Sequence, residues 1–249
     1  MEVQIGAAKV SKYATRESGD TLEIIERPFG GISAVLVDGQ RSGRAAKIIS
    51  NIVARKAISL LGEGVRDGAV ARAAHDYLRT HREGKVSAEL QVVSVDLSTH
   101  TLVISRNTQC PALILCDGQL QRFDAPSQPI GIYAYTKPVI MELPLRPNTY
   151  VVVFTDGIQA AGATRGLSLD IPQILMESAA AGLSAQALAD AILERALALD
   201  QSRPQDDMSV LVVAITPKEI ANSVRRFSAS FPFEPLREQP TSPELSAAH

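Results

Sequence analysis

The folds open to this chain are limited most by the order in which strand-like and helix-like segments follow one another in its sequence. Three apolar or alternating β-type runs open the chain, at residues 3–10, 22–27 and 32–37. Apolar residues at three- and four-residue spacing then predict a pair of helices over 43–61 and 69–81. Further strands are predicted at 86–96, 101–106, 112–116, 119–123, 139–143, 150–155 and 208–215, and further helices around 168–180 and 184–199, with Ser184 as the expected N-cap.

Most of these strands are joined by short links, which favours antiparallel pairing. Runs of strands interrupted by pairs of helices favour an α+β architecture over a doubly wound parallel sheet. The sequence therefore predicts a four-layer α-β-β-α sandwich, in which two mainly antiparallel sheets are flanked by helices. One domain is expected over residues 1–217, followed by a Pro/Ser/Glu-rich tail over 218–249 that is expected to be disordered.

Composition narrows the classes of function. The 249 residues are 45% hydrophobic, enough for a packed core, and the net charge of −2 offers no basic surface for nucleic acid or an anionic membrane. No signal peptide or long apolar run is apparent, so a cytoplasmic location is expected. Cys110 and Cys116 are expected to be reduced, and with four scattered histidines they form no zinc-type cluster.

Acidic residues stand where predicted strands end or begin. Asp38 and Asp156 each follow an apolar run and precede a glycine, whereas Asp206 and Asp207 precede the last run. A single Asp-Gly pair is more often a turn, but its repetition at strand ends weakens that interpretation. Carboxylates gathered at the rim of a sheet would form an oxygen-rich site of the kind that Mg²⁺ and Mn²⁺ prefer.

These residues belong to four motifs in a fixed order: Ser18-Gly19-Asp20, Asp38-Gly39 before Ser42-Gly43, Phe154-Thr155-Asp156-Gly157 and Asp206-Asp207-Met208-Ser209. Over residues 1 to about 216, the set resembles the PPM (type 2C) metal-dependent protein phosphatases. The forms of the first, second and last motifs are most similar to the SpoIIE and RsbU branch, and within it to stand-alone stressosome feedback phosphatases of the RsbX type.

The resemblance implies a serine/threonine protein phosphatase in which two divalent cations, Mn²⁺ or Mg²⁺, activate the water that attacks the phosphoryl group. The metal ligands that it implies are Asp38 as the bridge between both ions, the carbonyl of Gly39, Asp156, Asp206 and, directly or through water, Asp20. Asp38 and Asp156 are also the catalytic candidates, and Asp207 is expected to support the site.

Two departures from the family pattern affect the expected chemistry. Gly19 stands where many relatives carry glutamate, so one metal is expected to bind more weakly. The stretch after Gly39 lacks the histidine of many relatives, so protonation of the leaving group is expected to rely on water. Arg16 and Arg41 could either contact the substrate phosphate or be solvated surface charges, and both interpretations stay open. Arg44 is interpreted as a surface charge.

The substrate implied by the RsbX resemblance is a phosphorylated STAS-domain scaffold protein of the stressosome. Three alternatives stay open: a catalytically silent PPM-fold binding module, a phosphatase of another protein in an anti-sigma-factor pathway, or a phosphatase of a small phosphorylated metabolite. No nucleic-acid or membrane partner is expected. Retention of the complete set of strand-end aspartates favours an active enzyme over a silent binding module.

Overall fold

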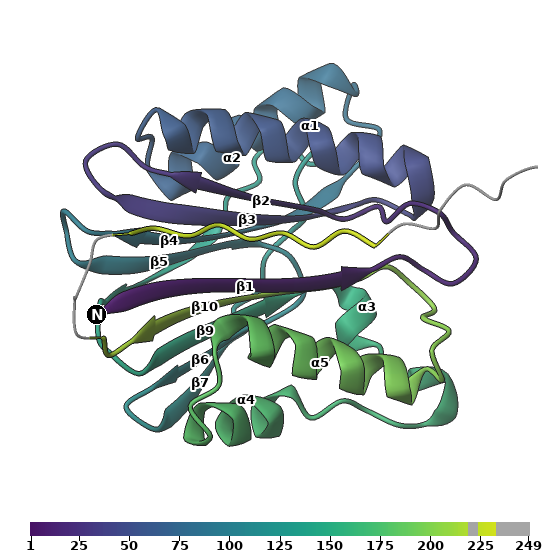
Figure 1. The fold of residues 1–249 in the computed structure, drawn as a ribbon. Coiled ribbons are helices and arrows are strands. Elements are labelled where there is room, and N and C mark those ends of the chain that lie inside the picture. The colour runs from purple at the N-terminus through teal and green to yellow at the C-terminus, as the bar shows by residue number, and fades with distance from the viewer. Residues whose placement is uncertain (219–223, 233–249) are drawn as a thin grey trace, which may run out of the picture. The chain divides into compact units, whose positions relative to one another are not determined.

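Two five-stranded sheets are formed by residues 1–218 of the computed structural model, which describes residues 1–218 and 224–232 (Figure 1). The first sheet has the order β1 (Glu2–Val10), β10 (Met208–Thr216), β9 (Thr149–Phe154), β6 (Ala112–Cys116) and β7 (Gln119–Phe123). The second has the order β2 (Thr21–Glu26), β3 (Gly31–Gly39), β4 (Ala88–Asp96), β5 (Thr101–Asn107) and β8 (Val139–Pro144). Every pairing between these strands is antiparallel, as predicted.

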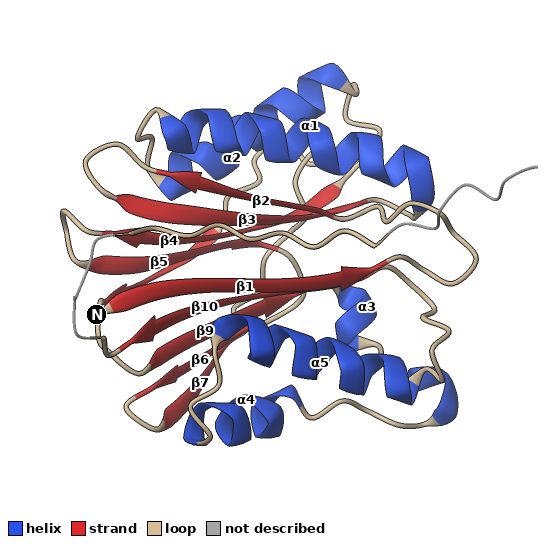
Figure 2. Ribbon diagram, in the orientation of Figure 1, coloured by secondary structure: helices blue, strands red, loops and turns tan. Residues whose placement is uncertain are grey.

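Helices cover the outer face of each sheet (Figure 2). Helices α1 (Gly43–Gly62) and α2 (Asp67–His81) pack on the β2–β3–β4–β5–β8 sheet, and α4 (Ile171–Ala180) and α5 (Ala185–Leu199) pack on the other. A short helix, α3 (Asp156–Gln159), directly follows β9, and a 3₁₀ turn spans Ala163–Arg165. The prediction of an α-β-β-α sandwich is confirmed.

The side chains of β3 show how the core is layered. Val35 and Val37 pack against α1 and α2, whereas Ala34 and Leu36 pack between the two sheets. Both faces of β3 are therefore buried, which explains why its sequence is nearly continuously apolar. Because side chains alternate along a strand, Asp38 follows Leu36 on the inter-sheet side, at the end of β3.

Helix starts are set by local capping. The Ser184 hydroxyl accepts a hydrogen bond from the Ala187 backbone N–H at 3.2 Å, which confirms this N-cap. The helix expected from about residue 168 instead begins at Ile171, because Asp170 accepts a hydrogen bond from the Gln173 N–H at 2.9 Å and caps it there. Helix α3 was not predicted, since four residues are too few to show an apolar period.

The compact unit Met1–Lys218 is distinct from a second unit, Glu219–His249. Most of the expected disordered tail, 218–249, lies outside the described residues; within it, 224–232 contain no helix or strand and are exposed. Both cysteines are free, as expected. None of the helices in the described ranges is long and apolar enough to cross a lipid bilayer.

Candidate active site

The predicted aspartates meet at one end of the space between the sheets. Burial of Asp38, followed by the charges of Asp20, Asp156, Glu89 and Asp206, raises the pKa of the Asp38 carboxyl to about 10. These carboxylates come from β3, β4, the start of α3 and the segments before β2 and β10. The structure therefore brings together all four aspartates that the sequence proposes as metal ligands.

Asp20 is fully buried, and its two carboxylate oxygens differ. Oδ2 accepts hydrogen bonds from the Ser209 hydroxyl at 2.6 Å and the Thr155 hydroxyl at 3.2 Å. Oδ1 is buried without a hydrogen-bond partner among the described residues. Burial raises the pKa of Asp20 to about 6, although the bond from Ser209 opposes this rise. An unpaired buried carboxylate oxygen is costly, and a bound cation would satisfy it.

The backbone beside Asp20 is held by two lysines and a serine. Lys9 Nζ and Lys47 Nζ donate hydrogen bonds to the Asp20 carbonyl oxygen at 2.8 and 2.6 Å. The Ser50 hydroxyl donates to the Gly19 carbonyl oxygen at 2.5 Å. Lys9 belongs to β1 and Lys47 to α1, so the segment that carries Asp20 is fixed from both halves of the sandwich.

Asp207 anchors the same segment from the other side. Its Oδ1 accepts a hydrogen bond from the Lys12 N–H, and its Oδ2 accepts one from the Gly19 N–H, both at 2.9 Å. Both carboxylate oxygens are therefore engaged with backbone donors. The adjacent Asp206 is less buried, and its Oδ1 accepts the Asp207 N–H at 2.9 Å.

Asp156 is the first residue of α3 and follows the buried strand β9. Burial and then the charge of Asp206 raise its pKa, whereas hydrogen bonds with the Gly157 backbone and with the Asp38 carboxyl lower it. Asp38 and Asp156 thus act on one another electrostatically, although β3 and the strand before α3 belong to different sheets.

The glycine after each of these aspartates is explained by packing. A side chain at Gly39 would place its Cβ 2.1 Å from the Ala46 carbonyl oxygen in α1. A Cβ at Gly157 would lie 2.2 Å from the Asp207 carbonyl oxygen. Only glycine permits these approaches, so both Asp-Gly pairs mark close backbone contacts within the protein. The assignment of the Gly39 carbonyl as a metal ligand stays a prediction.

The cluster is not a complete metal cage. Within residues 1–218 and 224–232, no three aspartate, glutamate, histidine or cysteine side chains are arranged to hold an ion by themselves. Waters or substrate oxygens would have to complete the coordination, as is usual for Mg²⁺. Arg16 and Arg41 are both exposed, so their interpretation stays open.

Sequence reasoning missed several residues of this site. Thr155 and Ser209 lie inside the recognised motifs, but no role was expected for their hydroxyls. Three further residues lie outside the motifs: Lys9, Lys47 and Glu89. They reach the site only through strand register and through contacts between segments that are distant in the sequence. Glu89 could have been suspected only if the pairing of β3 with β4 had been known.

Comparisons with known proteins show the family and the fold of this chain. A sequence model of the family described as Stage II sporulation protein E (SpoIIE) matches residues 28–216. The stage II sporulation protein E of Bacillus subtilis (strain 168) is 23% identical over 222 residues, a match that covers 87% of this chain and 26% of that protein. The chain thus spans about a quarter of the length of this curated relative.

Solved structures share the fold. The PP2C phosphatase domain with a fragment of the regulatory domain of Bacillus subtilis SpoIIE has a TM-score of 0.74 at 22% identity, covering 86% of this chain and 63% of that chain. RsbX in complex with magnesium has a TM-score of 0.63 at 12% identity, covering 85% and 94%. The catalytic domain of the serine/threonine phosphatase PstP with 2 manganese ions has a TM-score of 0.64 at 14% identity, covering 86% and 99%. This chain therefore has the fold of the PP2C phosphatase domain and belongs to the SpoIIE family.

Proposed function

We propose that the chain is a metal-dependent serine/threonine protein phosphatase. The observation that supports this most is the convergence of Asp20, Asp38, Asp156 and Asp206 at one end of the inter-sheet space. Mutual repulsion between buried carboxylates is unfavourable unless protons or cations compensate it. The buried Oδ1 of Asp20, which no residue in 1–218 or 224–232 hydrogen-bonds, also fits a cation ligand.

Two divalent cations, Mn²⁺ or Mg²⁺, would be held by these four carboxylates, with the Gly39 carbonyl as a further ligand. Such ions supply the chemistry of phosphate ester hydrolysis, because they lower the pKa of a bound water and offset charge on the phosphoryl oxygens. The chain's own contribution is to fix the ligands. Asp38 would hold the ions from the end of β3, and Asp207 would support the segment carrying Asp20.

Substitution of the central aspartates tests this proposal. Asp38→Asn and Asp156→Asn remove one negative charge each with little change of shape, so both variants are expected to fold. Their Mn²⁺-dependent hydrolysis of p-nitrophenyl phosphate should fall at least ~100-fold, the scale of lost metal-centred stabilisation. Asp190→Asn, at an exposed position on α5, is the matched control and should keep the wild-type rate. Near-wild-type rates in both variants, beside a wild type that needs metal, would misplace the metal site.

The substrate that we propose is a phosphorylated regulatory protein in the cytoplasm, specifically a STAS-domain scaffold protein of the stressosome. The motif forms shared with phosphatases of the RsbX type support this choice, and the common fold with RsbX is consistent with it. A phosphoprotein of another anti-sigma-factor pathway is the alternative within the same reaction class.

A further inference from the structure

Glu89 is an acidic residue that none of the sequence motifs includes. It lies on β4 directly across from Asp38 in the antiparallel register of β3 and β4. Its neighbour Leu90 packs toward α1 and α2, so Glu89 faces the opposite side of the sheet. Gln91 faces that same side, where its side chain donates a hydrogen bond at 2.8 Å to the Phe154 carbonyl oxygen of the other sheet. Glu89 therefore faces the space between the sheets, as Asp38 does.

The Glu89 carboxylate is fixed by the connection between β5 and β6. The Thr108 hydroxyl donates a hydrogen bond to Oε2, and the Gln109 backbone N–H donates one to Oε1 at 3.2 Å. Thr108 is fully buried, so its hydroxyl is a rigid anchor. In the described residues, no lysine or arginine forms an ion pair with Glu89. The carboxylate is thus held beside the aspartates without an ion-pair partner in this part of the chain, and the charge of Arg106 offsets its own charge only from a longer distance.

The electrostatic effect of this arrangement is unfavourable when no cation is bound. Burial raises the pKa of Glu89, and the hydrogen bonds from Thr108 and Gln109 oppose that rise. The negative charge of Glu89 contributes in turn to the raised pKa of Asp38. Like charges in a partly buried cluster disfavour the ionised state, and a divalent cation would reverse this effect.

We propose that Glu89 is a fifth carboxylate of the cation site, which accepts hydrogen bonds from cation-bound water and strengthens cation binding through its fixed charge. The inference rests on the proposed function. An independent observation supports a cation in this space, because Asp20 Oδ1 is buried beside the cluster and no described residue forms a hydrogen bond with it. Loss of a side chain that hydrogen-bonds around a metal site typically weakens metal binding about 10- to 100-fold.

Calorimetric titration with Mn²⁺ and thermal unfolding in EDTA test this role without any activity assay. Glu89→Gln keeps the shape and an acceptor oxygen for the Gln109 N–H but removes the charge. We expect its dissociation constant for Mn²⁺ to rise ~10-fold or more. In EDTA its melting temperature should rise by ~2 °C, because one unfavourable charge is removed. Glu89→Ser also removes the charge and should weaken Mn²⁺ binding to a similar extent, but its melting temperature is expected to fall because the acceptors for Thr108 and Gln109 are lost.

The sign of the stability change separates this role from a purely structural one. If Glu89 only anchors Thr108 and Gln109, Glu89→Gln should melt at a lower temperature in EDTA and both variants should bind Mn²⁺ with wild-type affinity, which would overturn the inference. Glu142→Gln, at an exposed position on β8 of the same sheet, is the control and should change neither measurement. If the wild-type protein binds no Mn²⁺, the proposed function itself fails, and this outcome is distinct from failure of the Glu89 assignment alone.

Discussion

At the scale of single residues, His75 makes the stability of the fold depend on pH. Its side chain is buried on α2, and its Nδ1 accepts a hydrogen bond from the Gly131 N–H at 3.0 Å. Its Nε2 has no hydrogen-bond partner among the residues that the structure describes and lies 3.9 Å from Asp76 Oδ1. Burial lowers the pKa of His75, with Arg79 acting in the same direction and Asp76 opposing both. The native state therefore favours the neutral imidazole, whereas the unfolded chain takes up a proton near pH ~6.5.

The sign of the pH effect follows from this difference. The contribution of His75 to stability is complete above pH ~6.5 and is lost as the pH falls through the lowered native pKa. Urea unfolding should show that the wild type loses more stability between pH 7 and 5 than His75→Gln does. The comparison with this variant cancels the contribution of the aspartates, which titrate in both proteins. Parallel pH profiles would mean that His75 is protonated equally in both states.

The site shows which residues can be recognised from sequence alone. Asp38, Asp156 and Asp206 could be identified because each adjoins an apolar strand, and this local pattern is visible without tertiary structure. Asp20 depended on the resemblance to a family, since it lies in a loop. Glu89 could not be identified, because it meets Asp38 only through the β3–β4 register, and register is not encoded in a local pattern.

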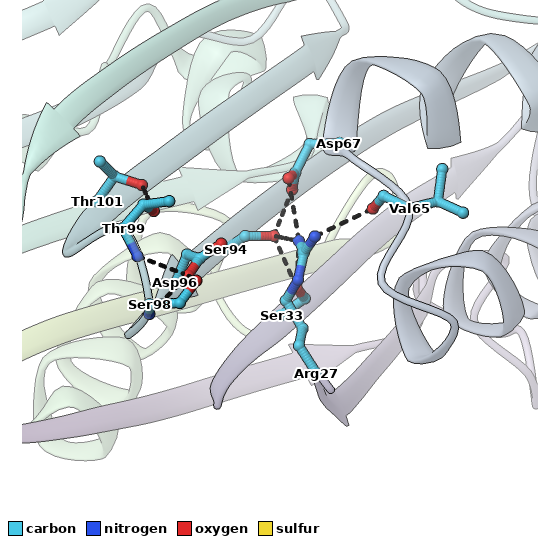
Figure 3. Close-up of polar contacts among 9 residues, drawn as sticks. All are labelled: Arg27, Ser33, Val65, Asp67, Ser94, Asp96, Ser98, Thr99 and Thr101. Atoms are coloured by element: carbon cyan, nitrogen blue, oxygen red, sulfur yellow. Dashed lines mark hydrogen bonds and ion pairs between the residues drawn. The ribbon is translucent and has the colours of Figure 1, made fainter. Parts of the chain in front are cut away.

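At the scale of elements, a buried ion pair joins the end of β2 to the start of α2 (Figure 3). Arg27 Nη1 lies 3.0 Å from Asp67 Oδ2, and both side chains are nearly inaccessible to solvent. Ser94 donates a hydrogen bond to the same carboxylate, and Arg27 Nη2 donates one to the Val65 carbonyl oxygen at 3.0 Å. The network therefore links the segment between α1 and α2 to β2 and β4 of the same sheet.

Removal of one partner should be much more damaging than removal of both. Asp67→Ala leaves the Arg27 guanidinium buried without its counter-charge, and we expect a loss of ~3–5 kcal/mol in the free energy of unfolding. The double variant Arg27→Met, Asp67→Leu should lose less, since no buried charge remains. Urea denaturation of both variants measures the difference. A single variant as stable as the double variant would show that the pair is solvated in solution.

Element boundaries were predictable where a local signal marks them and not elsewhere. The strands β6 and β7 match the predicted ranges because turn residues bound them on both sides. Helix α4 was placed three residues early, since its apolar pattern extends past the cap at Asp170. The Arg27–Asp67 pair has no sequence signature at all, because its members are separated by a complete helix and a strand.

At the scale of the whole molecule, the layers were predictable but the strand order was not. Alternating and continuous apolar runs indicate which faces are buried, and these suffice for two sheets between two helical layers. The first strand, β1, pairs with the last, β10, along nine residue pairs from Glu2–Thr216 to Val10–Met208. The two strands are separated by nearly all of the Met1–Lys218 unit, so no local sequence pattern could reveal that they pair.

The extent of protein surface that a substrate can contact should determine which substrates are hydrolysed efficiently. A recess lined by Phe154, Gln159, Leu169 and Ile171 lies between the end of β9, α3 and the start of α4. A folded phosphoprotein can contact this surface and gain rate from interactions remote from the phosphate, whereas p-nitrophenyl phosphate reaches only the proposed metal site. We therefore expect kcat/KM for a phosphorylated STAS-domain scaffold protein to exceed that for p-nitrophenyl phosphate at least ~100-fold, equivalent to ~2.7 kcal/mol of remote binding. Initial-rate assays in Mn²⁺ provide the measurement, with a phosphoprotein of another anti-sigma-factor pathway as the comparison. Equal efficiency on the scaffold protein and the small ester would refute the stressosome assignment and leave the proposed phosphatase chemistry unaffected.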